Sequence, residues 1–90
     1  MTHIEHLMAA FEEAEAQANA IDDLYDEMPD NEEVEAEWIR VTNRWRKLQE
    51  AVLNWIVDAS NGAIDNKTAR AILMGKREEF KELISKGGIS

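Results

Sequence analysis

The feature that most constrains the fold is a regular spacing of apolar residues between Asn31 and Asn61. Steps of four and three residues alternate without a break, which predicts one long α-helix with a single apolar seam. The seam consists of Val34, Trp38, Val41, Trp45, Leu48, Val52, Trp55 and Ala59. All 3 tryptophans of the chain belong to it, and aromatic side chains bury more area than any others. We therefore expect this helix to supply the centre of the core.

The residues before Asn31 carry a second seam of the same regularity. Its members are Ile4, Leu7, Phe11, Ala14, Ala18, Ile21, Tyr25 and Met28. Thr2 and Glu5 form a capping box at its start, and Pro29 ends it because proline cannot continue a helix. Two seams of similar length joined by a short turn predict an antiparallel hairpin of helices at 2–28 and 31–61.

Counting outward from the turn predicts the register of the hairpin. It places Tyr25 beside Trp38 and Ala18 beside Trp45, and close packing favours such large-against-small pairs. On this register Trp45→Ala should cost about 3–5 kcal/mol, because Ala14 and Ala18 cannot expand into the space that the indole leaves.

A turn at Asn61 and Gly62 should end the second helix, with Gly62 in the left-handed C′ position. Asp65 or Asn66 then caps a third helix at 66–86, in which Gly75 indicates a kink or a close contact. Its apolar face comprises Ala69, Ile72, Leu73, Phe80, Leu83 and Ile84.

The second helix is apolar on two faces around Leu53, Ile56 and Val57, so it needs a second partner helix. The third helix can supply that partner by packing on the base of the hairpin, opposite the Pro29 turn. We therefore predict an all-α three-helix bundle that forms a single domain over residues 1–90.

The composition agrees with this fold, since strong helix formers dominate and the chain has 4 glycines and 1 proline. The chain has no cysteine, which excludes disulfides and thiolate metal sites. No apolar run approaches the roughly 20 residues of a membrane span, and the first turn does not have the pattern of a signal peptide. We expect a cytoplasmic protein without a membrane partner.

The net charge of −9 is distributed very unevenly. Residues 1–37 contain thirteen acidic residues and no Lys or Arg, whereas residues 38–90 contain ten basic and six acidic residues, so the two parts carry −13 and +4. Phosphates would be repelled by the first part, which argues against direct nucleic-acid binding.

Nine carboxylates fall within sixteen residues around the predicted turn. They are Asp22, Asp23, Asp26, Glu27, Asp30, Glu32, Glu33, Glu35 and Glu37. We call this set the acidic tip and regard it as the candidate partner-binding site. The alternative is that it is only a solvated helix end.

Metal-binding patterns are incomplete in this sequence. His3 and His6 have neither a third spaced ligand nor a His-Glu-x-x-His pattern. A further set, Glu12 and Glu15 with Asp23 and Asp26, is similar to the Mg²⁺-binding helices of the all-α nucleotide pyrophosphatases, but here it should lie off the seams on a solvated face. No nucleophile–base pair stands out either. We predict a protein without enzymatic activity, cofactor or metal.

Basic residues follow the acidic part of the chain on both later helices. They are Arg40, Arg44, Arg46 and Lys47, then Lys76, Arg77 and Lys81. We expect them to pair with the acids of the first helix, because a nucleic acid would have to approach against a net charge of −9.

These features favour a small acidic protein-binding module. In charge and size the chain resembles small acidic helical proteins that occupy nucleic-acid-binding grooves, as many phage-encoded inhibitors of host defence do. The resemblance implies a partner with a basic surface, which the acidic tip would occupy as a nucleic-acid mimic. The alternative is a structural homo-oligomer in which the second apolar face of the 31–61 helix pairs between chains, so monomer and homodimer both remain open.

Overall fold

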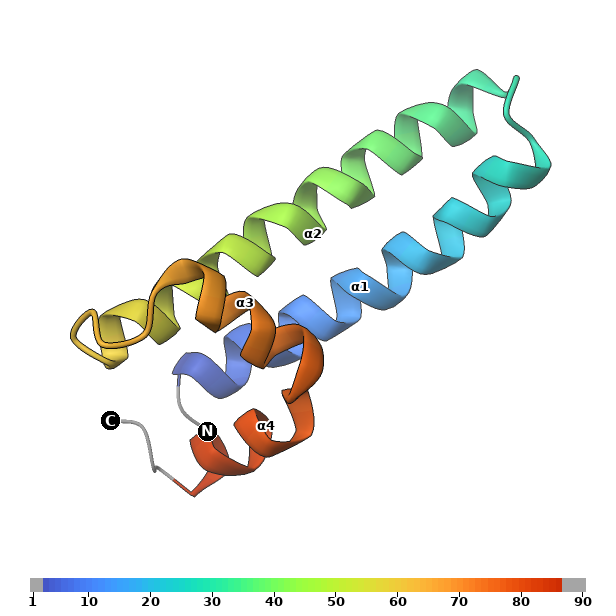
Figure 1. The fold of residues 1–90 in the computed structure, drawn as a ribbon. Helices are drawn as coiled ribbons and strands as arrows, with labels where there is room; N and C mark the ends of the chain where they lie inside the picture. The colour runs from blue at the N-terminus through green and yellow to red at the C-terminus, as the bar shows by residue number, and fades with distance from the viewer. Residues whose placement is uncertain (1–2, 87–90) are drawn as a thin grey trace.

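The computed structural model describes residues 3–86, and within that range it contains four α-helices and no strand. The helices are α1 (His3–Glu27), α2 (Glu32–Ala59), α3 (Asn66–Gly75) and α4 (Arg77–Ser85). Helices α1 and α2 form a long antiparallel hairpin, while α3 packs on α2 and α4 packs on α1 at the end away from the turn (Figure 1). The all-α prediction is confirmed. The three-helix bundle is not, because the predicted third helix is two helices.

The hairpin turn follows the predicted capping chemistry. Helix α1 ends at Glu27, two residues before Pro29. The side-chain oxygen of Asn31 then accepts hydrogen bonds from the backbone N–H groups of Glu33 and Val34, at 3.0 and 3.2 Å. These bonds satisfy two of the donors that a helix start leaves without partners. The predicted capping box involves Thr2, which lies outside the described residues.

The predicted register is confirmed near the turn. The rings of Tyr25 and Trp38 stack with their centroids 5.1 Å apart. Further along, Ala18 and Trp45 line the same groove between the two helices. If α1 were shifted by one residue relative to α2, these side chains would turn away from each other. The two seams are therefore sufficient to predict the register of the hairpin near the turn.

The end of α2 differs from the prediction by one position. Asn61, not Gly62, occupies the left-handed C′ position, with φ of 56°, and Gly62 follows with φ of 82°. The N–H of Asn61 bonds the carbonyl of Asp58, and that of Gly62 bonds the carbonyl of Val57, at 3.1 and 3.0 Å. This pattern is a Schellman motif, and asparagine tolerates the left-handed conformation better than most residues.

The predicted third helix breaks at Lys76, whose φ of −132° and ψ of 38° are not helical. The break separates α3, which ends at Gly75, from α4, which is capped at its end by Lys86. A close contact at Gly75 is not present, because a Cβ built there would meet nothing within 4 Å. The change of direction lets α4 cross α1, which one straight helix packed on α2 could not do (Figure 1).

The centre of the core lies where all four helices meet. The largest fully buried side chains are Phe11, Phe80, Leu53, Ile56, Leu73 and Val52. Helix α2 supplies Val52, Leu53 and Ile56 to this centre, as predicted, whereas its three tryptophans are only half-buried. Trp45 and Trp55 pack against the edge of the buried cluster, and Trp38 lies nearer the turn beside Tyr25.

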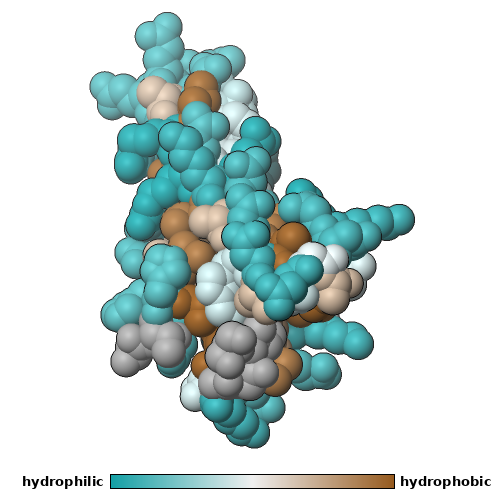
Figure 2. All heavy atoms as spheres, turned by 90° about the vertical axis from the view of Figure 1, so that its left-hand side faces the viewer, coloured by the Kyte–Doolittle hydropathy of each residue, from teal (hydrophilic) through white to brown (hydrophobic). Residues whose placement is uncertain are grey.

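Apolar residues are distributed unevenly over the surface as well. In Figure 2 hydrophilic atoms dominate the upper end, which is the hairpin turn, and hydrophobic atoms gather lower, over the base. Of the residues expected on the apolar face of the third helix, Phe80 and Ile84 are buried, whereas Leu83 is 45% exposed. We use the word base for the part of the chain in which α3 and α4 cover the hairpin.

Candidate functional site

The acidic tip projects from the base as a two-helix prong (Figure 1). Residues 22–27 belong to α1 and residues 32–37 to α2, and the stacked rings of Tyr25 and Trp38 hold the two segments side by side. Eight of its nine carboxylate residues are exposed, and Glu37 is half-buried. The structure therefore brings the nine predicted residues together at one end of the molecule.

Two of the nine carboxylates have partners. Glu37 forms an ion pair with Arg40 on the same helix, with a second hydrogen bond of 3.2 Å from Arg40 Nε. This guanidinium holds the pKa of the Glu37 carboxyl below its ordinary value. Asp22 accepts a hydrogen bond of 3.1 Å from the indole N–H of Trp38.

The remaining seven carboxylates (nine less two) have no ion pair within residues 3–86. They are Asp23, Asp26, Glu27, Asp30, Glu32, Glu33 and Glu35. In the first turn of α2, Glu32, Glu33 and Glu35 are favoured by the helix dipole. The last turn of α1 has no basic residue, so Asp26 and Glu27 lie unfavourably at its negative end.

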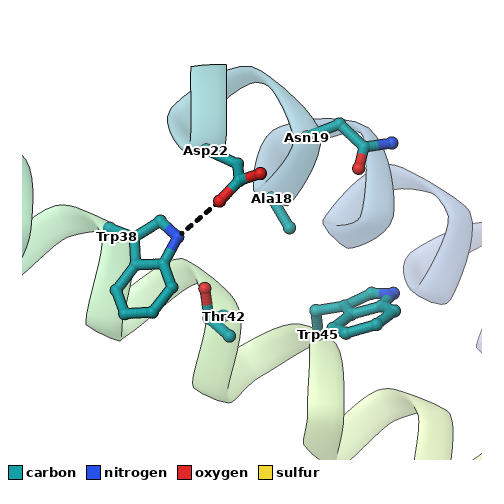
Figure 3. A pocket seen from close by; sticks show the side chains of 6 residues that line it. All are labelled: Ala18, Asn19, Asp22, Trp38, Thr42 and Trp45. Carbon is teal, nitrogen blue, oxygen red and sulfur yellow. Dashed lines mark hydrogen bonds between the residues drawn. The ribbon is translucent and has the colours of Figure 1, made fainter. Parts of the chain in front are cut away.

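A groove runs between α1 and α2 at the foot of the acidic tip. Six residues line it, and its volume is about 190 Å³. They are Ala18, Asn19 and Asp22 from α1, with Trp38, Thr42 and Trp45 from α2. The two indoles flank the opening, the Asp22 carboxylate lies above it, and Thr42 lies between the tryptophans (Figure 3). We call it the tryptophan groove.

Trp45 forms one end of this groove and also reaches toward the base. Its indole N–H is buried and has no hydrogen-bond partner of normal geometry among residues 3–86. The indole still lies close enough to Glu15 to contribute, after Arg77, to lowering the pKa of that carboxyl. Trp45 therefore lies between the tryptophan groove and the carboxyl of Glu15.

A charged cluster joins α4 to α1. Arg77 forms a bidentate ion pair with Glu15, whose second hydrogen bond is 3.0 Å. Lys81 Nζ lies 2.9 Å from a carboxylate oxygen of Glu12. The guanidinium of Arg77 also lies over the ring of Phe11, 5.1 Å from its centroid. These contacts tie the short helix α4 to the hairpin.

Arg77 stabilises the helix break as well as the α1–α4 contact. Its Nε donates a hydrogen bond of 3.2 Å to the carbonyl of Leu73 in the last turn of α3. Pairing with Glu15 raises the pKa of Arg77 and lowers that of Glu15. The sequence predicted that Arg77 and Lys81 pair with acids of the first helix, but it did not identify Glu12 and Glu15 as the partners.

The expectation that Glu12 and Glu15 lie on a solvated face is wrong, because both are partly covered by α4. Within residues 3–86 no three His, Cys, Asp or Glu side chains are arranged to hold a metal ion. His3 and His6 are both exposed.

The basic residues divide into two groups. Arg77 and Lys81 pair with acids of α1, as expected. Arg40 instead pairs within α2, and Arg44 donates a hydrogen bond of 3.1 Å to the amide oxygen of Gln17. For those two residues the expected pairing with α1 acids is wrong, because Glu37 on the same helix binds Arg40 and the α1 partner of Arg44 is the uncharged Gln17.

Comparison of the chain with family models, with curated proteins and with solved structures found no match. In the part of the chain that the structure describes, no helix is long and apolar enough to cross a membrane.

Proposed function

We propose that this chain is a non-enzymatic protein-binding module whose acidic tip docks on a basic surface of another protein. The observation that supports it best is the exposed cluster of seven carboxylates, which lacks ion pairs within residues 3–86 and projects beyond the rest of the molecule. Like charges at close helical spacing destabilise a helix. A hairpin that served only as a scaffold would gain stability from lysines at Asp26 and Glu27, which lie in the last turn of α1.

The charge density of the tip supports a partner surface that normally binds nucleic acid. Residues 22–27 and 32–37 run antiparallel, and each segment rises about 9 Å along its helix axis. Because Tyr25 lies beside Trp38, the two segments are staggered and together span about 14 Å. Excluding Glu37, they carry seven carboxylates, or one negative charge per about 2 Å, which is close to the one per about 1.7 Å of duplex DNA. A groove that attracts DNA phosphates would therefore attract this prong, and the chain would act there as an inhibitor in the manner of the phage proteins that it resembles in charge and size.

The structural homo-oligomer is supported less well by the packing. Its basis was the second apolar face of α2 around Leu53, Ile56 and Val57. Leu53 and Ile56 are 1% exposed within one chain, and Val57 is half-buried. That face is therefore covered by the chain itself and is not free for a second copy.

The test is affinity capture from a lysate of the native host with three versions of the chain. The tip variant carries Asp26→Lys, Glu27→Lys, Glu32→Lys and Glu33→Lys, all at exposed positions. The control variant carries Glu13→Lys, Glu50→Lys, Asp58→Lys and Glu82→Lys, which are exposed and outside the tip and change the charge equally.

We expect the wild type and the control variant to retain one partner that duplex DNA displaces, and the tip variant to lose it. Binding should also weaken steeply between 0.1 and 1 M salt, as the Debye length falls from about 10 to about 3 Å. Equal recovery with both variants would show that the tip is only a solvated helix end.

A further inference from the structure

The tryptophan groove combines chemical groups that the acidic tip itself lacks. We propose that it receives an arginine side chain of the basic partner, so that the tip supplies attraction and the groove supplies a specific anchor. This inference rests on the proposed function, and it names the group on the partner that the surface recognises.

The walls of the groove suit a planar cation. Trp38 and Trp45 flank the opening, and the face of an indole is the best aromatic partner for a guanidinium. Arginine is less strongly hydrated than lysine and stacks on aromatic rings through its flat guanidinium. An arginine side chain can therefore enter between indoles at a lower desolvation cost than a lysine ammonium.

The rim of the groove supplies hydrogen-bond acceptors for that cation. The Asp22 carboxylate lies above the opening, fixed by the 3.1 Å hydrogen bond that one of its oxygens accepts from Trp38 (Figure 3). Its second oxygen makes no hydrogen bond within residues 3–86. The amide oxygen of Asn19 and the hydroxyl of Thr42 line the same groove. A guanidinium has five N–H donors to match them.

The groove is also partly preorganised. Trp38 is held by stacking on Tyr25 and by its hydrogen bond to Asp22, so binding would order little that is not already ordered. The charge around it selects the sign of the ligand, since Asp23 and Asp26 lie within one helical turn of Asp22. An anion would be repelled, and a neutral side chain would leave the carboxylate without a charged partner.

The experiment uses the three indole N–H groups as reporters. A peptide, acetyl-Gly-Arg-Gly-amide, is titrated into ¹⁵N-labelled protein, and the indole signals are followed by NMR. The matched control peptide replaces arginine with citrulline, which has the same shape without the charge. Trp55 is an internal control because it packs on Phe80 at the base, with the ring centroids 6.2 Å apart.

We expect the arginine peptide to shift the Trp38 and Trp45 signals with saturation, while Trp55 stays unchanged and the citrulline peptide has at least fivefold weaker effects. Unsaturated shifts, equal shifts with citrulline or equal shifts at Trp55 would each overturn the inference.

Two single variants separate the groove from the general field of the tip. Asp22→Asn keeps an oxygen that can accept the Trp38 N–H and removes only the charge, whereas Asp23→Asn removes the same charge at an exposed position outside the groove. We expect Asp22→Asn to weaken the arginine peptide at least fivefold and Asp23→Asn less than twofold.

Equal weakening by the two variants would overturn the groove as a specific site. The proposed function is tested independently, because the tip variant used for affinity capture leaves all six groove residues intact. If the partner is lost from the tip variant while the arginine peptide does not bind, the proposed function stands and the groove inference fails.

Discussion

The base and the acidic tip of this molecule use the same two helices in opposite ways. At the base, α3 and α4 cover the hairpin and enclose Phe11 and Phe80 almost completely. Toward the tip the hairpin has no such cover, and Val34 and Val41 are the only buried residues among 22–41 of the described chain. The charges differ as well, because Glu12 and Glu15 have cationic partners while seven tip carboxylates have none within residues 3–86.

The difference shows that stability and exposed charge are separated along the hairpin. Apolar burial and partly buried ion pairs concentrate at one end, so the other end can carry a like-charge cluster without unfolding the whole chain. A change of the same chemical type should therefore have different effects at the two ends.

The largest effect should come from Phe11→Ala at the base. Phe11 is 0% exposed, and we expect a loss of about 3–5 kcal/mol in the free energy of unfolding, since the cavity cannot be filled by its neighbours. Trp38→Ala, at the tip, should cost less although it removes a larger side chain, because one side of the indole is already open. Urea unfolding measures both. A larger loss for Trp38→Ala would contradict the assignment of the core to the base.

Removal of the Arg77 side chain should cause the next largest loss in the free energy of unfolding. We expect Arg77→Ala to lower the unfolding free energy by about 1.5–3 kcal/mol, because it leaves Glu15 partly covered without its charged partner. Arg40→Ala is the matched control at the tip, where the ion pair with Glu37 is exposed and should contribute little. Equal losses for the two variants in thermal or urea unfolding would show that the α1–α4 cluster does not hold α4.

The pH dependence of stability should also come mainly from the base. The hydrogen bonds from Arg77 lower the pKa of Glu15 in the folded chain below its ordinary value of 4.5. The stabilisation by Glu15 is therefore complete above that ordinary value and is lost as the pH falls through the lower folded-state pKa.

The measurement is urea unfolding of wild type and Glu15→Gln between pH 7 and pH 3. The wild type should be the more stable at pH 7, and the difference should shrink toward pH 3. Glu13→Gln, at an exposed position nearby, should show no such pH-dependent difference. A constant difference for Glu15→Gln would exclude ionisation of this carboxyl as its cause.

The smallest change in the free energy of unfolding should be a gain and not a loss. Asp26→Lys and Glu27→Lys place cations in the last turn of α1, and each should raise stability by about 0.3–1 kcal/mol at low salt. Glu12→Lys, at the base, should lower stability because it removes the partner of Lys81. The gain at the tip should disappear at 1 M salt, whereas a gain that persists there would point to a cause other than charge.

The sequence was sufficient to predict the hairpin because its signals are local. Pro29 and Asn31 set the turn, and the predicted helices at 2–28 and 31–61 agree with His3–Glu27 and Glu32–Ala59 within two residues at each described end. The register followed from the two seams and is confirmed by the stacking of Tyr25 on Trp38. The nine tip carboxylates could also be placed together, since they flank that turn.

The remaining features depend on contacts between distant parts of the chain. The buried face of α1 includes Met8 where the seam predicted Leu7, because α4 covers a side of α1 that a two-helix seam leaves open. The pairing of Arg77 with Glu15 spans 62 residues and has no periodic signal. The tryptophan groove was missed because heptad spacing indicated burial, and it could not show that two indoles would remain half-open.

The break at Lys76 has a consequence for the order of folding. Helix α4 has nine residues, too few to be stable alone, and its ion pairs with Glu12 and Glu15 close long loops, of 62 residues in the case of Arg77 and Glu15. The hairpin turn closes a far shorter loop, so we expect α1 and α2 to associate early and α4 to dock after the rate-limiting step. Stopped-flow kinetics of Arg77→Ala should then show faster unfolding with an almost unchanged refolding rate. Slower refolding would place the docking of α4 in the folding nucleus.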